Sequence, residues 1–173
     1  MDSELEVGGA FIKRSSAYLA GDYLPKIRRA LKGLSHEDIW WRPNRASNSV
    51  GNLMLHLAGN VRQWVVSGIG GHPDTRRRDE EFLADGDLQA DSLLARLEEA
   101  VREAEDVLAS LHASQLLETR VIQGMNVSVL DALYHVVEHF STHTGQILYL
   151  SKLRTGRDLG FWEIKDGRAI PRW

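Results

Sequence analysis

The chain contains 173 residues, of which 43% are hydrophobic and 26% are charged, a composition typical of a globular protein and unlike that of a disordered or fibrous one. Lys and Arg number 21 and Asp and Glu 24, so the formal charge of -3 offers no general attraction for nucleic acid or for an anionic membrane. The absence of cysteine excludes disulfides, thiolate metal ligands and a cysteine nucleophile. Any thiol chemistry would therefore need a thiol from outside the chain.

The length is that of one domain, and we expect a single domain over residues 1–173. The first residues, Met1 to Gly9, are acidic and lack the apolar segment of a secretory signal. No later stretch stays apolar long enough to span a bilayer. We therefore expect a cytoplasmic protein.

Four segments carry apolar residues at helical spacing, and loops rich in Gly, Pro, Asn and Asp separate them. The first segment extends from about Ala10 to Leu34, and Gly21 and Pro25 are expected to bend or interrupt it. Ser35 can then cap a short helical turn, with Asp38 at the reciprocal capping position.

The second main helix is predicted from roughly Val50 to Gly68, with Asn48 or Ser49 as its cap. A long crossover follows from Gly70 to Asp91, because this stretch contains Gly-Gly, a proline and a block of charges, with room for one short helix. The third helix is predicted from Leu93 to Leu111, with charged residues on its solvent face.

The fourth helix is expected to begin at a cap formed by Asn126 or Ser128, and to continue to about Leu153 before Gly156 ends it. The aromatic and basic tail, residues 157–173, shows no periodic pattern, and strands are not expected. Four amphipathic helices without strands must bury their apolar faces against one another, which predicts an all-α four-helix bundle. The long links after the second and third helices argue against a simple up-down-up-down order.

Three histidines of the fourth helix, His135, His139 and His143, follow one another at four-residue spacing. Side chains four apart differ by about 40° around the helix axis, so two neighbouring imidazoles can bind one ion. On a helical wheel His143 lies nearest to the apolar face, followed by His139 and then by His135, which makes His139 and His143 the more buried pair.

A third ligand must come from another helix, and His56 flanks the apolar stripe of the second helix at an offset similar to that of His139. Imidazole nitrogen suits zinc, nickel, copper and iron, and three protein ligands leave a position for water or substrate. The alternatives remain open, because paired histidines also occur on surfaces and a single histidine is often a hydrogen-bonded core residue. The remaining histidines are interpreted as structural or solvated: His36, His72 and His112.

The residues around these histidines resemble the DinB/YfiT-like metalloenzyme family over essentially the whole chain. The segments that carry the resemblance are Trp40–Pro43, Ser47–Asn60 and His139–Ile147. The resemblance implies a bundle of up-down-down-up order, often dimeric, with a metal ion such as nickel or zinc held by His56, His139 and His143. His135 lies one turn too early for this triad and is expected beside the metal ligands or in solvent. Gln146 is a candidate to orient a metal-bound water, or a polar residue flanking the packed stripe.

Members of the wider superfamily resemble transferases in which the metal binds a low-molecular-weight thiol such as bacillithiol or mycothiol. A cation near sulfur favours the thiolate, which is the nucleophilic form. One alternative is metal-assisted hydrolysis, although the nearest carboxylate in sequence, Glu138, lies about 100° from His139 on the wheel. Another is a protein without catalytic activity that binds a metal or a small ligand.

Two further sets of residues have more than one interpretation. Polar residues near His56 and in the crossover either contact a thiol cofactor or form a solvated surface: Asn52, Asn60, Arg62, Gln63 and Arg76 to Arg78. Aromatic residues either line a substrate pocket or form a dimer contact, with core packing favoured for Trp64: Trp40, Trp41, Trp64, Phe161, Trp162 and Trp173.

Overall fold

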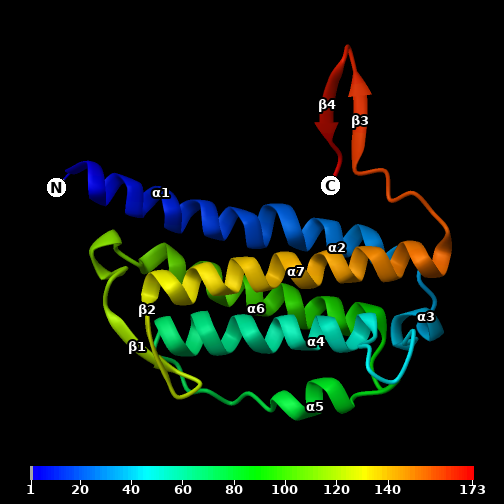
Figure 1. Ribbon diagram of the computed structural model, residues 1–173, viewed down its shortest axis with the longest axis horizontal. Coiled ribbons are helices and arrows are strands. Elements are labelled where there is room, and N and C mark those ends of the chain that lie inside the picture. Colours follow the sequence, from blue (N-terminus) through cyan, green and yellow to red (C-terminus); the bar gives the residue numbers. More distant parts are fainter. Residues whose placement is uncertain (1) are drawn as a thin grey trace.

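The computed structural model describes residues 2–173 and consists mostly of helices, with two small antiparallel strand pairs (Figure 1). In chain order, the elements are α1 (Asp2–Tyr18), η1 (Leu19–Tyr23), α2 (Leu24–Leu31), α3 (His36–Trp40), α4 (Val50–Val61), η2 (Arg62–Ile69), α5 (Arg78–Leu83), α6 (Ala90–Ser110), η3 (Ala113–Gln115), β1 (Thr119–Ile122), β2 (Met125–Ser128), α7 (Val129–Thr155), β3 (Trp162–Lys165) and β4 (Arg168–Pro171). None of the helices in this part of the chain is both long enough and apolar enough to cross a membrane.

The first helix begins earlier than predicted, at Asp2, and continues through α1, η1 and α2 to Leu31. Acidic side chains in its first turns favour a helix start, because they complement the partial positive charge of the amino-terminal end. The predicted interruption near Gly21 and Pro25 takes the form of the π-helical turn η1, after which the helix goes on. Proline cannot donate an amide hydrogen to the preceding turn, and a local π-helical turn is one way of accommodating this loss.

Serine side chains cap three of the helices. Ser35 and Asp38 form the predicted reciprocal pair at the start of α3. Of the two predicted caps for the second main helix, the structure uses Ser49, whose hydroxyl accepts a hydrogen bond from the amide of Asn52 at 3.1 Å while the Asn52 side chain accepts from the amide of Ser49. Ser128 likewise caps α7. These caps determine where the helices that carry the histidines begin.

The prediction that the chain has no strands is wrong. Strands β1 and β2 form a hairpin immediately before α7, and β3 and β4 form a second hairpin in the tail. Both turn dipeptides, Gln123-Gly124 and Asp166-Gly167, have positive φ at each residue, the conformation that matches the twist of a two-residue hairpin. The strands have four residues each and are too short to produce a clear alternating pattern, although Asp-Gly is itself a hairpin signal.

The long helices lie side by side, and α4 packs against α6, α5 and α7 (Figure 1). In the figure α1 and α2 run in the same direction as α7, whereas α4 and α6 run in the opposite direction. Apolar side chains from all of them form the core, including Ile27, Leu57, Leu97, Phe140 and Ile147, each 0% exposed. Trp64 is buried in this core, as predicted. The contact between α4 and α7 brings the histidines of the two helices together.

Candidate metal centre

The three histidines of the predicted triad meet between α4 and α7. The Nε2 atom of His139 lies 3.0 Å from Nε2 of His56 and 3.2 Å from Nε2 of His143. One ligand atom from each ring can be chosen so that all lie within 4.8 Å of one another, and the three residues could hold a metal ion. The backbone explains this convergence, because His139 and His143 occupy successive turns of α7 and His56 faces them from α4.

Hydrogen bonds on the outer side of two rings indicate where their protons lie. Nδ1 of His56 is 2.9 Å from Oε2 of Glu81, and Nδ1 of His143 is 2.7 Å from Oε1 of Gln146. Both oxygens are acceptors. Nη2 of Arg76 also lies 3.1 Å from Nδ1 of His56, but it donates to Oε2 of Glu81 at the shorter distance of 2.8 Å. In the metal-binding form of each ring we therefore assign the proton to Nδ1. Nε2 of His56 and Nε2 of His143 then each present a lone pair to the centre. Gln146 therefore orients the ring of His143, and its predicted contact to a metal-bound water stays a prediction.

A cation between the three rings would be a suitable partner for these nitrogen atoms. Lone pairs on neighbouring nitrogens repel one another, and the single N–H of His139 cannot point at two acceptors at once. Imidazole nitrogen is a usual ligand of transition metals such as zinc. The donor set thus suits one transition-metal ion, and three protein ligands would leave positions for other ligands.

Burial favours the neutral form of His139 and His143, which is the form that binds metals. Desolvation, with the neighbouring imidazoles as smaller contributors, lowers the pKa of His139 to about 3. Burial also lowers the pKa of His143, although its hydrogen bond to Gln146 acts in the opposite direction. Nδ1 of His139 is buried and has no hydrogen-bond partner among the described residues.

His135 lies outside the cluster, as expected. Its ring packs against Trp64 with 4.1 Å between the ring centroids, and its Nε2 is 3.5 Å from Nδ2 of Asn60. Burial lowers the pKa of His135 as well. Glu138, considered as a base for hydrolysis, is exposed and accepts a hydrogen bond from Thr142.

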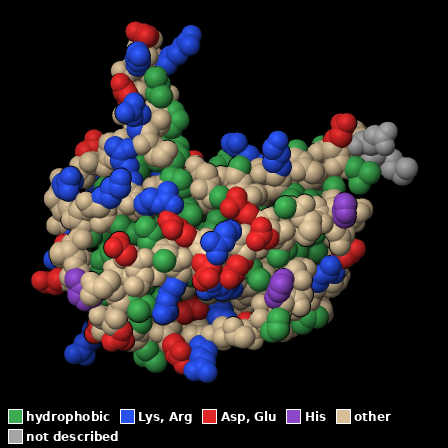
Figure 2. Space-filling model, turned by 180° about the vertical axis from the view of Figure 1, so that it is seen from behind, with side chains coloured by type: hydrophobic (Ala, Val, Ile, Leu, Met, Phe, Trp, Pro, Cys, Tyr) green, Lys and Arg blue, Asp and Glu red, His purple; other side chains and the backbone are tan. Residues whose placement is uncertain are grey.

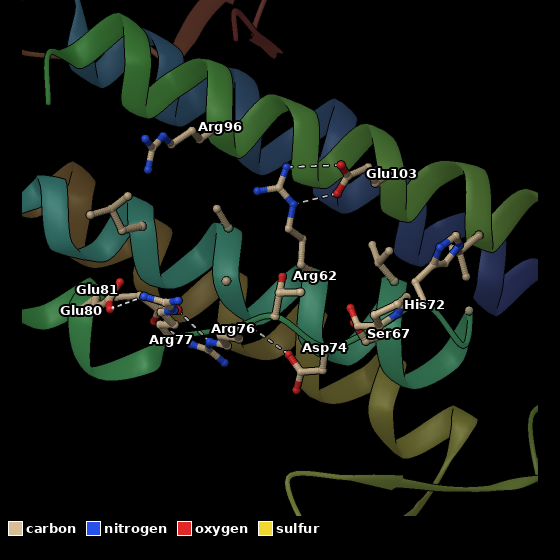
Figure 3. Close-up of a pocket in the computed structure, with 18 of the residues that line it drawn as sticks. Arg62, Ser67, His72, Asp74, Arg76, Arg77, Glu80, Glu81, Arg96 and Glu103 are labelled. Carbon is tan, nitrogen blue, oxygen red and sulfur yellow. Dashed lines mark hydrogen bonds and ion pairs between the residues drawn. The ribbon is translucent and has the colours of Figure 1, made fainter.

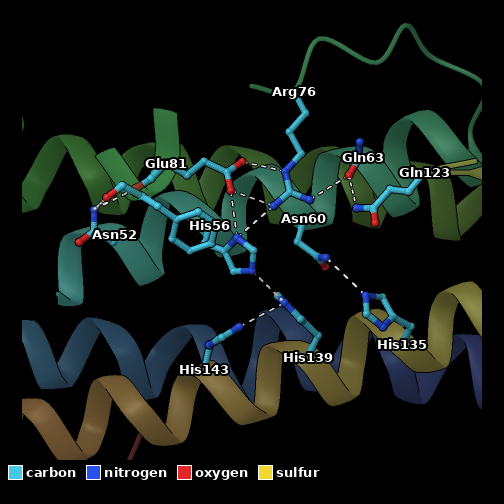
Figure 4. A network of polar contacts seen from close by, with 11 residues as sticks. Asn52, His56, Asn60, Gln63, Arg76, Glu81, Gln123, His135, His139 and His143 are labelled. Atoms are coloured by element: carbon cyan, nitrogen blue, oxygen red, sulfur yellow. Dashed lines mark hydrogen bonds and ion pairs between the residues drawn. The ribbon is translucent and has the colours of Figure 1, made fainter. Parts of the chain in front are cut away.

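Two charged residues from the crossover complete the surroundings of His56 (Figure 4). The guanidinium of Arg76 donates to both carboxylate oxygens of Glu81, at 2.7 and 2.8 Å, and Oε2 of Glu81 accepts from His56. Burial alone would raise the pKa of Glu81, but the hydrogen bonds from Arg76 and His56 outweigh it and hold the pKa below its usual value. The sequence predicts Arg76 either as a cofactor contact or as a solvated residue, and its pattern assigns no role to Glu81.

Other predicted cofactor contacts have structural partners. Nδ2 of Asn52 donates to the backbone carbonyls of Glu81 and Ala84, both at 2.9 Å, so Asn52 holds the crossover against α4. Arg62 pairs with Glu99 and Glu103 of α6. The side chains of Asn52 and Arg62 are thus engaged by the crossover and by α6. The interpretation of Asn52 and Arg62 as contacts to a metal-bound cofactor therefore receives no support.

A groove of about 1110 Å³ lies between α4, η2, α6 and the crossover (Figure 3). Arg76 and Glu81 belong to its wall, whereas the three histidines do not line it. Charged side chains crowd this face of the molecule, where red and blue groups meet at the centre of Figure 2. The Arg76–Glu81 pair thus separates the groove from the histidine cluster.

The fold and this cluster define a mostly helical protein whose α4–α7 contact could hold a metal ion. The chain belongs to the family described as a protein of unknown function, DUF1572, whose family model matches residues 7–168. A comparison with functionally curated proteins found no significant match.

Proposed function

We propose that this protein is a metalloenzyme of the DinB-like superfamily and that His56, His139 and His143 bind one divalent transition metal, with nickel or zinc as the preferred ions. The observation that carries the proposal is the convergence of three imidazole Nε2 atoms, two of them held as acceptors by hydrogen bonds on the outer side of their rings. Imidazole ligands favour zinc, nickel and copper over magnesium and calcium.

The arrangement of the helices supports the proposed superfamily. The α1–α2 segment and α7 run one way and α4 and α6 the other (Figure 1), which is compatible with the four-helix, up-down-down-up order that the resemblance implies. The second and fourth long helices, α4 and α7, pack against each other. The ligands of the proposed site come from this pair of helices.

We propose transfer of a low-molecular-weight thiol to an electrophile as the reaction. A bound cation would supply positive charge that favours the thiolate, while the three histidines hold that cation and leave positions for the sulfur. Hydrolysis with a carboxylate as base would need such a group beside the metal. Glu138 is exposed, and Glu81 is engaged by Arg76 and by the outer nitrogen of His56. The transferase is therefore preferred over a hydrolase that uses a carboxylate base.

Elemental analysis of protein purified without an affinity tag tests the metal site. We expect about one transition-metal ion per chain in the parent and a strong loss in His143→Ala. His135→Ala is the matched control, because it removes an imidazole from the same helix outside the cluster, and it should retain the metal. A parent that binds neither nickel nor zinc after loading, or a His143→Ala variant that retains the ion, would overturn the proposal.

A panel of thiols with a generic electrophile tests the reaction. Thiol consumption that requires the metal and disappears in His143→Ala supports a transferase. A metal-loaded protein that consumes none of the thiols would instead favour the hydrolase or the non-catalytic alternative.

We also propose that the protein is a homodimer, with the β3–β4 hairpin as a contact. This hairpin projects from the body, with hydrophobic side chains along one edge (Figures 1 and 2). Trp162 and Ile164, two apart on β3 and therefore on one face, are 59% and 71% exposed. An isolated two-stranded hairpin is only marginally stable in water, so burial of this face against a second copy would stabilise it. At its base, Lys26 of α2 packs on Trp173.

A further inference from the structure

Glu81 reaches the back of His56 from a segment that contributes no metal ligand. Its side chain is 10% exposed and that of Arg76 is 3% exposed, so the ion pair is buried behind the ring. The carboxylate uses one oxygen for Nε of Arg76 and the other for Nη2 of Arg76 and Nδ1 of His56. Arg76 thereby neutralises Glu81, while His56 donates a hydrogen bond to the same carboxylate.

The Arg76–Glu81 ion pair lies against the α4 backbone, where Gly59 has no side chain. A Cβ atom on Gly59 would lie 2.0 Å from Oε1 of Glu81 and 2.9 Å from Nε of Arg76. Only a glycine allows the ion pair to lie so close to the helix, three residues beyond His56. Asn52 holds the backbone carbonyl of Glu81 from the preceding turns of α4. Two positions on α4 therefore accommodate the crossover where its carboxylate meets the histidine.

Gln63 holds Arg76 from the other side. Its Oε1 accepts from Nη1 of Arg76 at 2.9 Å and from the side chain of Gln123 at the tip of the β1–β2 hairpin, while its Nε2 donates to Asp74 (Figure 4). Nε, Nη1 and Nη2 of Arg76 thus each donate a hydrogen bond to a side-chain oxygen of Glu81 or Gln63. The guanidinium has a defined position, and Glu81 has one as well.

We infer that Glu81, held by Arg76, is the positioning residue of the metal centre: it directs Nε2 of His56 at the ion and increases the donor strength of that imidazole. This inference rests on the proposed metal site and adds to it a residue outside the ligand set. A carboxylate that accepts the outer N–H of a metal-binding histidine fixes the ring orientation and makes the ring a better ligand. Arg76 keeps this carboxylate charged and in place.

The test is metal affinity, measured by competition with a chelator, in Glu81→Gln and in Glu80→Gln. Glu80 is the adjacent acid, whose side chain is 66% exposed and pairs with Arg77 at the surface. Loss of a carboxylate partner weakens metal binding about 10- to 100-fold. We expect that loss for Glu81→Gln, a change in the visible spectrum of bound Co²⁺, and no more than a twofold change for Glu80→Gln.

Glu81→Gln leaves the buried Arg76 without its partner and is at risk of misfolding. A double variant, Arg76→Gln with Glu81→Gln, removes both charges and keeps similar volumes, and it should show the same loss of affinity and the same Co²⁺ spectrum. Urea unfolding of each apoprotein separates a loss of stability from a loss of ligand strength. Parent-like affinity and spectrum in the folded variants would overturn the inference while leaving the metal site intact. Absence of metal binding in the parent would instead refute the proposed function.

Discussion

Gly59→Ala is predicted to weaken metal binding although it replaces neither a proposed ligand nor a charged residue. The added Cβ would lie 2.0 Å from Oε1 of Glu81, whereas ordinary contact begins at 3.4 Å. The carboxylate must therefore move by about 1.4 Å, the difference between these values, because it is the flexible end of a side chain whereas the helix backbone is fixed. The same carboxylate accepts the hydrogen bond from Nδ1 of His56, with 2.9 Å between Nδ1 and Oε2 of Glu81. This hydrogen bond is expected to break when the carboxylate moves.

The expected loss of metal affinity follows from the loss of the hydrogen bond between His56 and Glu81. A 10- to 100-fold fall in metal affinity corresponds to about 1.4–2.7 kcal/mol of binding free energy. In a helix interior, alanine is favoured over glycine by about 1 kcal/mol, which offsets part of the steric cost in the apoprotein. We therefore expect metal affinity to fall by 10-fold or more, while the free energy of unfolding of the apoprotein changes by about 1 kcal/mol or less.

Gly9→Ala in α1 is the matched control, because a Cβ there meets no atom within 4 Å. Chelator competition should give parent affinity for the control and weakened affinity for Gly59→Ala, and Co²⁺ spectra should change only for the latter. If Gly59→Ala binds metal as tightly as the parent, the position of Glu81 does not govern the centre and the reasoning is refuted.

Three further outcomes are expected. The pKa of His139 is about 3 in the folded chain and near 6.5 in the unfolded chain. Between these pH values the unfolded apoprotein binds more protons than the folded apoprotein. Urea titrations should therefore show that the free energy of unfolding of the apoprotein falls from pH 7 to pH 5. This fall should be smaller in His139→Asn, and an equal fall in that variant would contradict the assignment. Ser49→Ala should destabilise the protein by about 1–2 kcal/mol in the same assay, because a buried cap is lost, and an unchanged midpoint would refute its role. Trp162→Ser should shift the mass measured by light scattering from dimer toward monomer at micromolar concentration, and a dimer of unchanged stability would exclude the hairpin contact.

The helices and the histidine cluster were predictable because both depend on local periodicity. Four-residue spacing placed His139 and His143 on one side of their helix, and the apolar stripe ranked them above His135. The same wheel argument brought His56 to face them. The expected short helix in the crossover is present as α5, and the capping serines lie within the predicted pairs. Each of these features depends on residues within about two turns of one another.

The two hairpins and the role of Glu81 could not be predicted from helical periodicity. A four-residue strand contains too few alternations to stand out, and only its turn dipeptide signals it. Glu81 lies 25 residues from His56, in a block of charges typical of a solvated surface. The available hint was Gly59, since a glycine inside a strong amphipathic helix indicates the close approach of another group. The identity of that group could come only from the three-dimensional path of the crossover.

The three proposed ligands differ in what holds the outer side of each ring, and this difference has a chemical consequence. His56 faces a carboxylate, His143 faces the neutral amide of Gln146, and Nδ1 of His139 has no partner among the described residues. A negatively charged acceptor increases the basicity of an imidazole more than a neutral one does. His56 should therefore be the strongest donor and His139 the weakest. Because the strongest donor lies on α4 and depends on the crossover, metal binding would couple the crossover to the α4–α7 pair.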